Sequence, residues 1–341
     1  MSQIVKRYFE SMAANAVTRN AYFKPGTYTR RHLLAGSAVA ACGRHHQTEI
    51  AVVPKSVFDL FFVSVHAGAE KAARDAQVNI LWKGPDDETD TSRQIQIVDA
   101  MIARRVDGIA ISGTEARALA APLEHAFRQG IPVTVFDSAT DFDNYVSFVA
   151  TDNHGAGCSA ARALAALTGG RGNVGMVMQK PGGMSTSMRE RGFEETMAKE
   201  FPAIRIAARQ FGMGDRAKSR AAAENILTAH PELAGIFASS EAASIGSIQA
   251  IRGRNLSRKI KLITFDFSES HVEALKDGTI DAMFVQDPFR IGYEAVKSLT
   301  EKIGGRIPAH RLDLPARMIV KSDLTRPEIQ ALLFPEWLKA R

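Results

Sequence analysis

The pattern of apolar and polar positions becomes regular at about residue 48. From there, short apolar runs rich in Val, Ile and Phe alternate with longer stretches whose apolar residues recur every three to four positions. The short runs predict buried strands and the longer stretches predict amphipathic helices. The predicted strands are 49–54, 78–82, 107–111, 132–136, 147–150, 173–178, 204–208, 234–238, 260–265, 281–285 and 316–320. The predicted helices include 61–76, 93–105, 115–129, 153–168, 216–229 and 288–303.

This alternation predicts an α/β fold, in which parallel strands are joined by helical crossovers. The strands are too many for one open sheet of ordinary size. Two of them end in the same way, with Asp137 after "VTVF" and Asp266 after "LITF". Ligands of open α/β sheets bind beyond the carboxyl ends of the strands. We therefore expect two similar lobes that each bring one aspartate to a shared cleft; the alternative is that each aspartate caps the helix after it.

The distribution of charged residues along the chain indicates where the protein is located. The 341 residues are 45% hydrophobic and 23% charged, which is typical of globular proteins. The net charge is +6, but residues 1–41 hold six basic residues and one acidic residue, so the remainder is nearly neutral. This distribution argues against nucleic-acid binding. The cations instead indicate an export signal.

The leader has the features of that signal. Arg30 and Arg31 precede the apolar stretch "LLAGSAVAAC", as in twin-arginine signals. The ending "VAAC" resembles the lipobox of bacterial lipoproteins, in which Cys42 would be diacylated and would anchor the protein to a membrane. The alternative is an ordinary secretory signal cleaved near Ala41. No apolar stretch approaches the ~20 residues that span a bilayer.

Motifs for catalysis are missing from the sequence. It contains no G-x-S-x-G, no Walker A loop and no H-E-x-x-H, so we expect no enzyme activity, no cofactor and no metal. The segment "KPGGMSTS" precedes a predicted helix. Its Ser185 or Ser187 could either bind a ligand at the helix N-terminus or simply cap the helix.

Several ordered segments resemble the ribose- and galactose-type periplasmic sugar-binding proteins of ABC transporters, whose fold lactose-repressor-type ligand domains share. They include "IAVVPKSVFDLFFVSVHAGAEKAA", "GIPVTVFDSAT", "RERGFEETMA" and "LITFDFSESHVEALKDGTIDAMFVQDPF". The resemblance implies a type I periplasmic binding protein fold with two Rossmann-like lobes and a hinge crossed three times, near 151–152, 286–287 and 313–315. It divides the chain into a leader and linker (1–47), an N-terminal lobe (48–151 plus 287–314), a C-terminal lobe (152–286 plus 315–323) and a helical tail (324–341).

The same resemblance implies the function of an exported, monomeric solute-binding protein. It would bind a monosaccharide or polyol and deliver it to a membrane permease. The ligand residues carried over by position are Lys55, Asp59, Phe61, Phe62, Asp137, Ser138, Arg189, Ser240, Asp266 and Gln286. One phenylalanine of the Phe61–Phe62 pair would stack on the sugar and the other would belong to the helix core. Arg191 is the neighbouring alternative to Arg189.

Some positions depart from the family pattern. Ribose-binding members have asparagine, arginine and asparagine where this chain has Asp59, Ser138 and Ser240, and an aromatic residue where it has Gly214. Ribose is therefore not implied, and the basic and acidic residues also suit a charged or aminated ligand. Two other functions remain open: a sensory protein that presents a sugar to a receptor, and a lactose-repressor-type transcriptional regulator. The regulator would need an N-terminal helix-turn-helix, but the arginine pair and the apolar stretch occupy that part of the chain.

Overall fold

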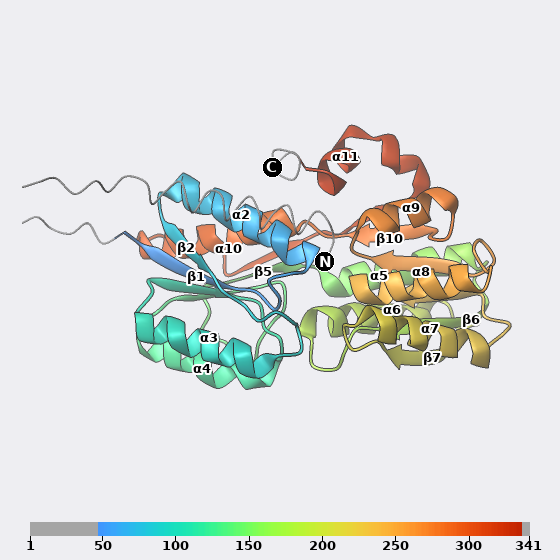
Figure 1. The fold of residues 1–341 in the computed structure, drawn as a ribbon, viewed down its shortest axis with the longest axis horizontal. Helices are drawn as coiled ribbons and strands as arrows, with labels where there is room; N and C mark the ends of the chain where they lie inside the picture. The colour runs from blue at the N-terminus through green and yellow to red at the C-terminus, as the bar shows by residue number, and fades with distance from the viewer. Residues whose placement is uncertain (1–46, 336–341) are drawn as a thin grey trace, which may run out of the picture.

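The computed structural model describes residues 47–335, which form two α/β lobes side by side (Figure 1). Cys42, most of the predicted leader and residues 336–341 lie outside this range. The strands are β1 (Glu49–Val53), β2 (Asn79–Trp82), β3 (Gly108–Ile111), β4 (Val133–Phe136), β5 (Ser147–Thr151), β6 (Gly172–Met178), β7 (Ile204–Phe211), β8 (Gly235–Ala238), β9 (Lys261–Phe265), β10 (Ala282–Val285), β11 (Arg311–Leu314) and β12 (Arg317–Ile319). The helices are α2 (Leu60–Ala76), α3 (Thr91–Arg104), α4 (Ala116–Arg128), α5 (Asn153–Leu167), α6 (Met184–Glu200), α7 (Arg216–Ala229), α8 (Glu241–Gly253), α9 (Glu269–Asp277), α10 (Pro288–Ile303) and α11 (Pro327–Leu333), with a 3-10 turn at Lys321–Thr325.

The first lobe is built on a parallel sheet with the strand order β11-β5-β4-β3-β1-β2. Side chains of a strand alternate between the two faces. Ile50 and Val52 of β1 face a core formed with α2 and α10, whereas Ala51 and Val53 face a core formed with α3 and α4. Because both faces are buried, the strand is apolar throughout, as in other parallel sheets.

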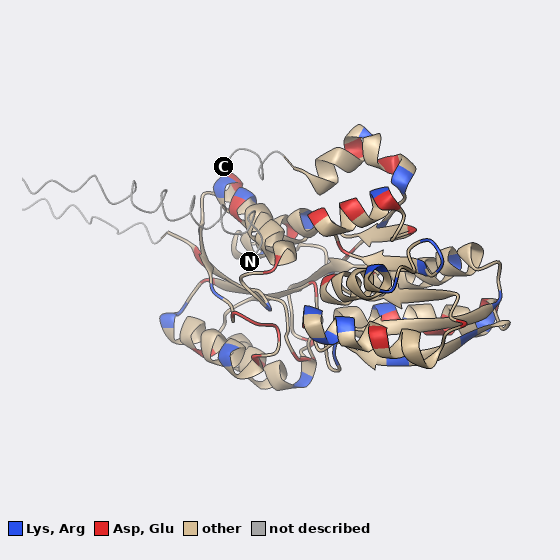
Figure 2. Cartoon of the chain, turned by 45° about the vertical axis from the view of Figure 1, so that its right-hand side comes forward, with Lys and Arg blue, Asp and Glu red and all other residues tan. Residues whose placement is uncertain are grey.

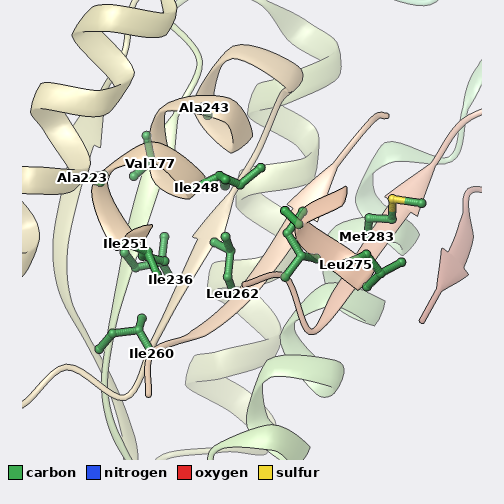
Figure 3. Close-up of a cluster of buried hydrophobic side chains, with 14 of the residues drawn as sticks. Val177, Ala223, Ile236, Ala243, Ile248, Ile251, Ile260, Leu262, Leu275 and Met283 are labelled. Atoms are coloured by element: carbon green, nitrogen blue, oxygen red, sulfur yellow. The ribbon is translucent and has the colours of Figure 1, made fainter. Parts of the chain in front are cut away.

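The second lobe repeats this architecture with the order β12-β10-β9-β8-β6-β7. Helices α5 and α6 cover one face and α7, α8 and α9 cover the other. Figure 3 shows Ile236, Leu262 and Met283 from neighbouring strands packed in the latter core, beside Ile248 and Ile251 of α8. The tail helix α11 closes the same core. Helices on the outside of both lobes carry charges of both signs (Figure 2).

The chain passes between the sheets three times. Strand β5 belongs to the first sheet, but α5 packs on the second lobe; β10 belongs to the second sheet, but α10 packs on the first. Only Pro315 and Ala316 separate β11 of the first sheet from β12 of the second. The chain enters the second sheet at the carboxyl ends of its strands. Strand β12 therefore runs antiparallel to β10, and the expectation of parallel strands is wrong for this one.

Pairs of glycines allow the helices to cross closely in each lobe. A Cβ added at Gly68 of α2 would lie 1.9 Å from the Phe289 carbonyl oxygen, and one at Gly292 of α10 would lie 2.0 Å from that of Val65. In the second lobe, Cβ atoms at Gly157 and Gly192 would meet backbone oxygens of α6 and α5 at 2.0 and 2.2 Å. These distances are too short for any side chain, so both crossings require glycine.

We predict that Gly292→Ala destabilises the protein by about 1–3 kcal/mol, because the methyl group forces two backbones apart. Gly253→Ala is the matched control. Among the described residues, the nearest atom outside the backbone of its own helix would lie 3.9 Å from its Cβ, and alanine favours the helix by up to about 1 kcal/mol. Urea unfolding of both variants gives the comparison. Equal stability of Gly292→Ala and the unsubstituted protein would contradict the close crossing.

Candidate functional site

The two strand-end aspartates occupy equivalent positions. Asp137 follows β4 and Asp266 follows β9, and both have a left-handed backbone with φ of +56° and +66°. This conformation is costly for residues other than glycine and is often found at functional sites. Their backbone N–H groups donate to the neighbouring strand, to Val149 O at 2.9 Å and to Phe284 O at 2.8 Å. The repetition seen in the sequence is therefore a repetition of local geometry.

Neither aspartate caps a helix, so that alternative is wrong. Asp137 is followed by a loop that leads to β5, and the N-cap of α9 is Ser268. The Asp137 carboxylate accepts from Ser112 Oγ at 2.7 Å and lies 3.3 Å from Lys55 Nζ. The Asp266 carboxylate accepts from Gln286 Nε2 at 2.6 Å.

The two carboxylates contribute to one cavity between the lobes, with a volume of about 570 Å³. Nine of the ten predicted ligand residues line it: Lys55, Asp59, Phe61, Phe62, Asp137, Arg189, Ser240, Asp266 and Gln286. Ser138 does not line it; its buried hydroxyl lies 3.4 Å from the Ser185 backbone nitrogen of the opposite lobe. A cavity of this size is large enough for a small ligand.

Arg189 is a buried cation on α6. Its side chain is 2% exposed, and its guanidinium donates to Ser239 O and to Asn153 Oδ1, at 2.5 and 2.8 Å. The guanidinium carbon lies 3.7 Å from the centre of the Phe265 ring. The Nε atom is itself buried and has no hydrogen-bond partner among residues 47–335. An unpaired buried donor of this kind is unfavourable.

Arg191, the alternative to Arg189, is exposed and pairs with Glu195 at 3.1 Å. It does not line the cavity. The two arginines are separated by two positions on α6, and such residues lie on different faces of a helix. The structure therefore favours Arg189 as the cleft arginine.

Charged side chains around the buried part of the cavity shift one another's pKa values. Burial would lower the pKa of Lys55, but Asp137 and Glu88, at 3.3 and 3.5 Å from its Nζ, raise the pKa above its usual value. Burial raises the pKa of Asp266, while Arg189 and the hydrogen bond from Gln286 oppose that shift. Burial likewise lowers the pKa of Arg189, against the charges of Asp266 and Asp137. Cations and carboxylates are thus interleaved, which suits hydroxyl groups that both donate and accept.

The aromatic pair at the start of α2 has two environments. Phe62 is 1% exposed and packs in the core, whereas Phe61 is half-buried. Their rings meet edge to face at 5.0 Å, and both line the cavity. This arrangement is consistent with one stacking ring and one core ring.

Gln286 joins the cavity to two segments that pass between the lobes. Its Nε2 donates to Asp266, and its Oε1 accepts from Thr151 Oγ1 at 2.7 Å. Thr151 ends β5 immediately before the first passage, and Gln286 lies at the second. Gln286 therefore links Asp266 to both connecting segments by hydrogen bonds.

Sequence reasoning missed part of the cavity wall. The loop after β2 contributes an acidic run, Asp86, Asp87 and Glu88, and the second lobe contributes Gln179, Arg216 and Glu241. The run "PDDETD" directly after a predicted strand was the available signal. Ser185 and Thr186 also line the cavity. The N-cap of α6 is Gly183, so the alternative in which Ser185 or Ser187 caps this helix is wrong.

Residues 50–307 match the model of a protein family described as "Periplasmic binding protein domain". The chain belongs to this family of periplasmic binding proteins. The resemblance found in the sequence is thereby confirmed, and so is the two-lobed α/β fold. No helix between residues 47 and 335 is long and apolar enough to cross a membrane.

Several periplasmic binding proteins are similar over most of the chain. A D-ribose/D-allose-binding protein of Pseudomonas aeruginosa is 28% identical over 83% of this chain and 94% of its own length. An ABC transporter solute-binding protein of Agrobacterium vitis, solved with α-D-tagatopyranose, is 32% identical with a TM-score of 0.81, over 84% of this chain and 99% of that one. A carbohydrate transporter solute-binding protein of Agrobacterium radiobacter, solved with D-arabinose, is 31% identical with the same TM-score, over 85% and 99% of the two chains.

The lobes of this periplasmic binding protein are in contact across the cavity. Lys180, which follows β6 in the second lobe, donates from Nζ to two carbonyl oxygens of the first lobe, Glu88 O at 2.9 Å and Thr114 O at 3.0 Å. Gln179 Nε2 lies 3.4 Å from the Glu88 carboxylate. These bonds can form only while the lobes are closed.

We predict that Lys180→Met shifts the unliganded protein toward an open form. A hydrogen bond to a charged group contributes about 1.5–3 kcal/mol, so losing the pair should raise the open-to-closed ratio about tenfold or more. Small-angle scattering and the distance between spin labels on the two lobes measure this shift. Lys199→Met, at an exposed position of α6, is the control. An unchanged distance distribution in Lys180→Met would show that these bonds do not hold the lobes together.

Proposed function

We propose that this protein is the solute-binding component of an ABC transporter and that it closes its two lobes around a monosaccharide or related polyol. One observation carries the proposal: Asp137 and Asp266, one from each lobe, line the same cavity as the buried Arg189, whose Nε has no partner among the described residues. Carboxylates accept from sugar hydroxyls and the guanidinium donates to them. The sugars bound by the similar proteins support this ligand class.

Closure is the functional step in this proposal. The hinge comprises residues near 151–152, 286–287 and 313–315, where the chain passes from one sheet to the other. A ligand shifts the equilibrium between open and closed forms only by its differential affinity for them. Contacts with an aspartate from each lobe exist together only in the closed form. The closed protein would then be the form that a membrane permease recognises.

We predict that Asp137→Asn and Asp266→Asn each weaken sugar binding about tenfold or more. Each change removes a charge-assisted hydrogen bond, which contributes about 1.5–3 kcal/mol. The sugar is first found with a thermal-shift panel of pentoses, hexoses and polyols, and each variant is then titrated calorimetrically. Asp143→Asn, in an exposed loop, is the control. Should either cavity variant bind like the control, that aspartate does not contact the ligand.

We also propose that the exported protein is anchored to the membrane through diacylated Cys42. The support is the sequence "VAAC" after Arg30 and Arg31, which lies outside the residues that the structure describes. An anchor would keep the binding lobes close to the permease.

In a bacterial host, we expect Cys42→Ser to move the protein from the membrane fraction to the soluble fraction, because only a cysteine at this position can be acylated. Fractionation followed by immunoblotting measures the distribution. Cys158→Ser, which changes the other cysteine of the chain, is the control and should leave the protein in the membrane fraction. Recovery of the exported unsubstituted protein entirely in the soluble fraction would refute the anchor.

A further inference from the structure

The described cavity wall has a marked excess of negative charge. Eight carboxylates line it but only three basic side chains, Lys55, Arg189 and Arg216. Neutral sugars need acceptors, but they do not need a net negative site. The distribution of these charges therefore carries information about the ligand.

The negative charges of the carboxylates in the buried part of the cavity are balanced by nearby cations. Lys55 Nζ lies 3.3 Å from the Asp137 carboxylate, and the charge of Arg189 acts on both Asp137 and Asp266. This part is nearly balanced and has both donors and acceptors. It suits the hydroxyl groups of a polyol.

A second group of carboxylates has fewer positive charges nearby than negative charges of its own. We call Asp59, Glu88 and Glu241 the acidic trio. Glu88 shares Lys55 with Asp137, and Glu241 accepts from Arg216 at 2.6 Å. Asp59 forms no ion pair with any residue between 47 and 335. Burial together with the charges of Glu88 and Glu241 raises its pKa to about 7, while Ser56 and Lys55 act against the shift.

The acidic trio comes from both lobes. Asp59 and Glu88 belong to loops of the first lobe, and Glu241 is the first residue of α8 in the second. Closing the lobes brings like charges together, which opposes closure. A cation placed among the three would reverse that effect, and it would bind the closed form more tightly than the open form.

Arg189 supplies an independent indication that a ligand occupies this cavity. It lines the cavity, its side chain is 2% exposed, and its Nε has no hydrogen-bond partner among the described residues. The cavity thus has one end for an oxygen-rich group and another for a positive charge.

We propose that the ligand is a polyhydroxylated compound that carries a protonated amine, with its hydroxyls between Asp137 and Asp266 and its ammonium group among Asp59, Glu88 and Glu241. Amino sugars and amino-alditols are the corresponding chemical classes. This inference rests on the proposed binding of a sugar or polyol in the interlobe cavity.

The test compares matched ligands that differ only at the amine. The full mature chain is titrated calorimetrically with glucosamine, glucose and N-acetylglucosamine, with the corresponding galactose and mannose series, and with 1-amino-1-deoxysorbitol beside sorbitol. At least one amine should bind ten times more tightly than both its hydroxyl parent and, where one exists, its acetamide. Asp59→Asn should reduce this ratio toward one, whereas Asp143→Asn should leave it unchanged.

The pH dependence provides a second measurement. The charged groups that face Asp59 are Lys55 of its own loop, Glu88 of the loop after β2, and Glu241 and Arg216 of the second lobe. Asp59 loses its proton as the pH rises through about 7. An aliphatic ammonium group stays charged over this range. The affinity for 1-amino-1-deoxysorbitol should therefore increase between pH 6 and pH 8, and this increase should vanish in Asp59→Asn.

The outcomes separate this inference from the proposed function. If a neutral sugar binds at least as tightly as every amine, the inference is overturned and the binding of a sugar or polyol stands. If no neutral or aminated compound binds, the proposed function fails and the inference fails with it.

Discussion

The compensation of two buried cations, Lys55 and Arg189, is the constraint on which the cleft depends. Removing a charge from water is very costly unless a partner of opposite charge or strong hydrogen-bond acceptors replace the water. Lys55 meets this requirement through Asp137 and Glu88. Arg189 meets it through two oxygen acceptors, a ring face and the nearby charges of Asp137 and Asp266. The strand ends of both lobes are therefore tied to the same pair of cations.

The two lobes share the same backbone features but differ in the side chains around them. Each has a left-handed aspartate at a strand end and a helix crossing that only glycine permits. Asp152 and Asp287 cap the helices that follow the first two passages between the sheets, each accepting from the backbone N–H three residues on, at 2.9 and 3.0 Å. The cleft is thus built on related frameworks but is chemically asymmetric, since Asp137 is paired with a lysine and Asp266 with a glutamine. An asymmetric cleft can distinguish the two ends of a ligand.

Ligand contact and interlobe geometry share one hydrogen-bond chain. Asp266 lies in the cavity, Gln286 lies at a passage between lobes, and Thr151 ends the strand before another passage. Gln286 uses both of its side-chain polar atoms in this hydrogen-bond chain. Lys180 and the carbonyls that it contacts close the cavity from a different direction.

The sequence by itself determined the alternation of strands and helices, the presence of two lobes and the recurrence of an aspartate, Asp137 and Asp266, at one strand end of each lobe. These features are local or repeated, and buried parallel strands have an apolar signature that a single chain reveals. Family resemblance added seven more of the residues that line the cavity, including Arg189 and Gln286. The acidic run at 86–88 was visible in the sequence, but nothing in it indicated that the run faces Gln179 and Lys180, which lie 91 and 92 positions from Glu88.

Only the tertiary structure decided which side chains face one another across the cleft. The antiparallel direction of β12 follows from where the chain enters the second sheet. The sequence does not reveal this direction, because side chains alternate between the two faces in the same way in parallel and antiparallel strands. Ser138 and Arg191 carry the right chemistry, but one is covered by the opposite lobe and the other lies on another face of its helix. The balance of charges around Asp59 depends on distances between segments remote in sequence. Electrostatic interactions act through space, so this balance is set only when the lobes meet.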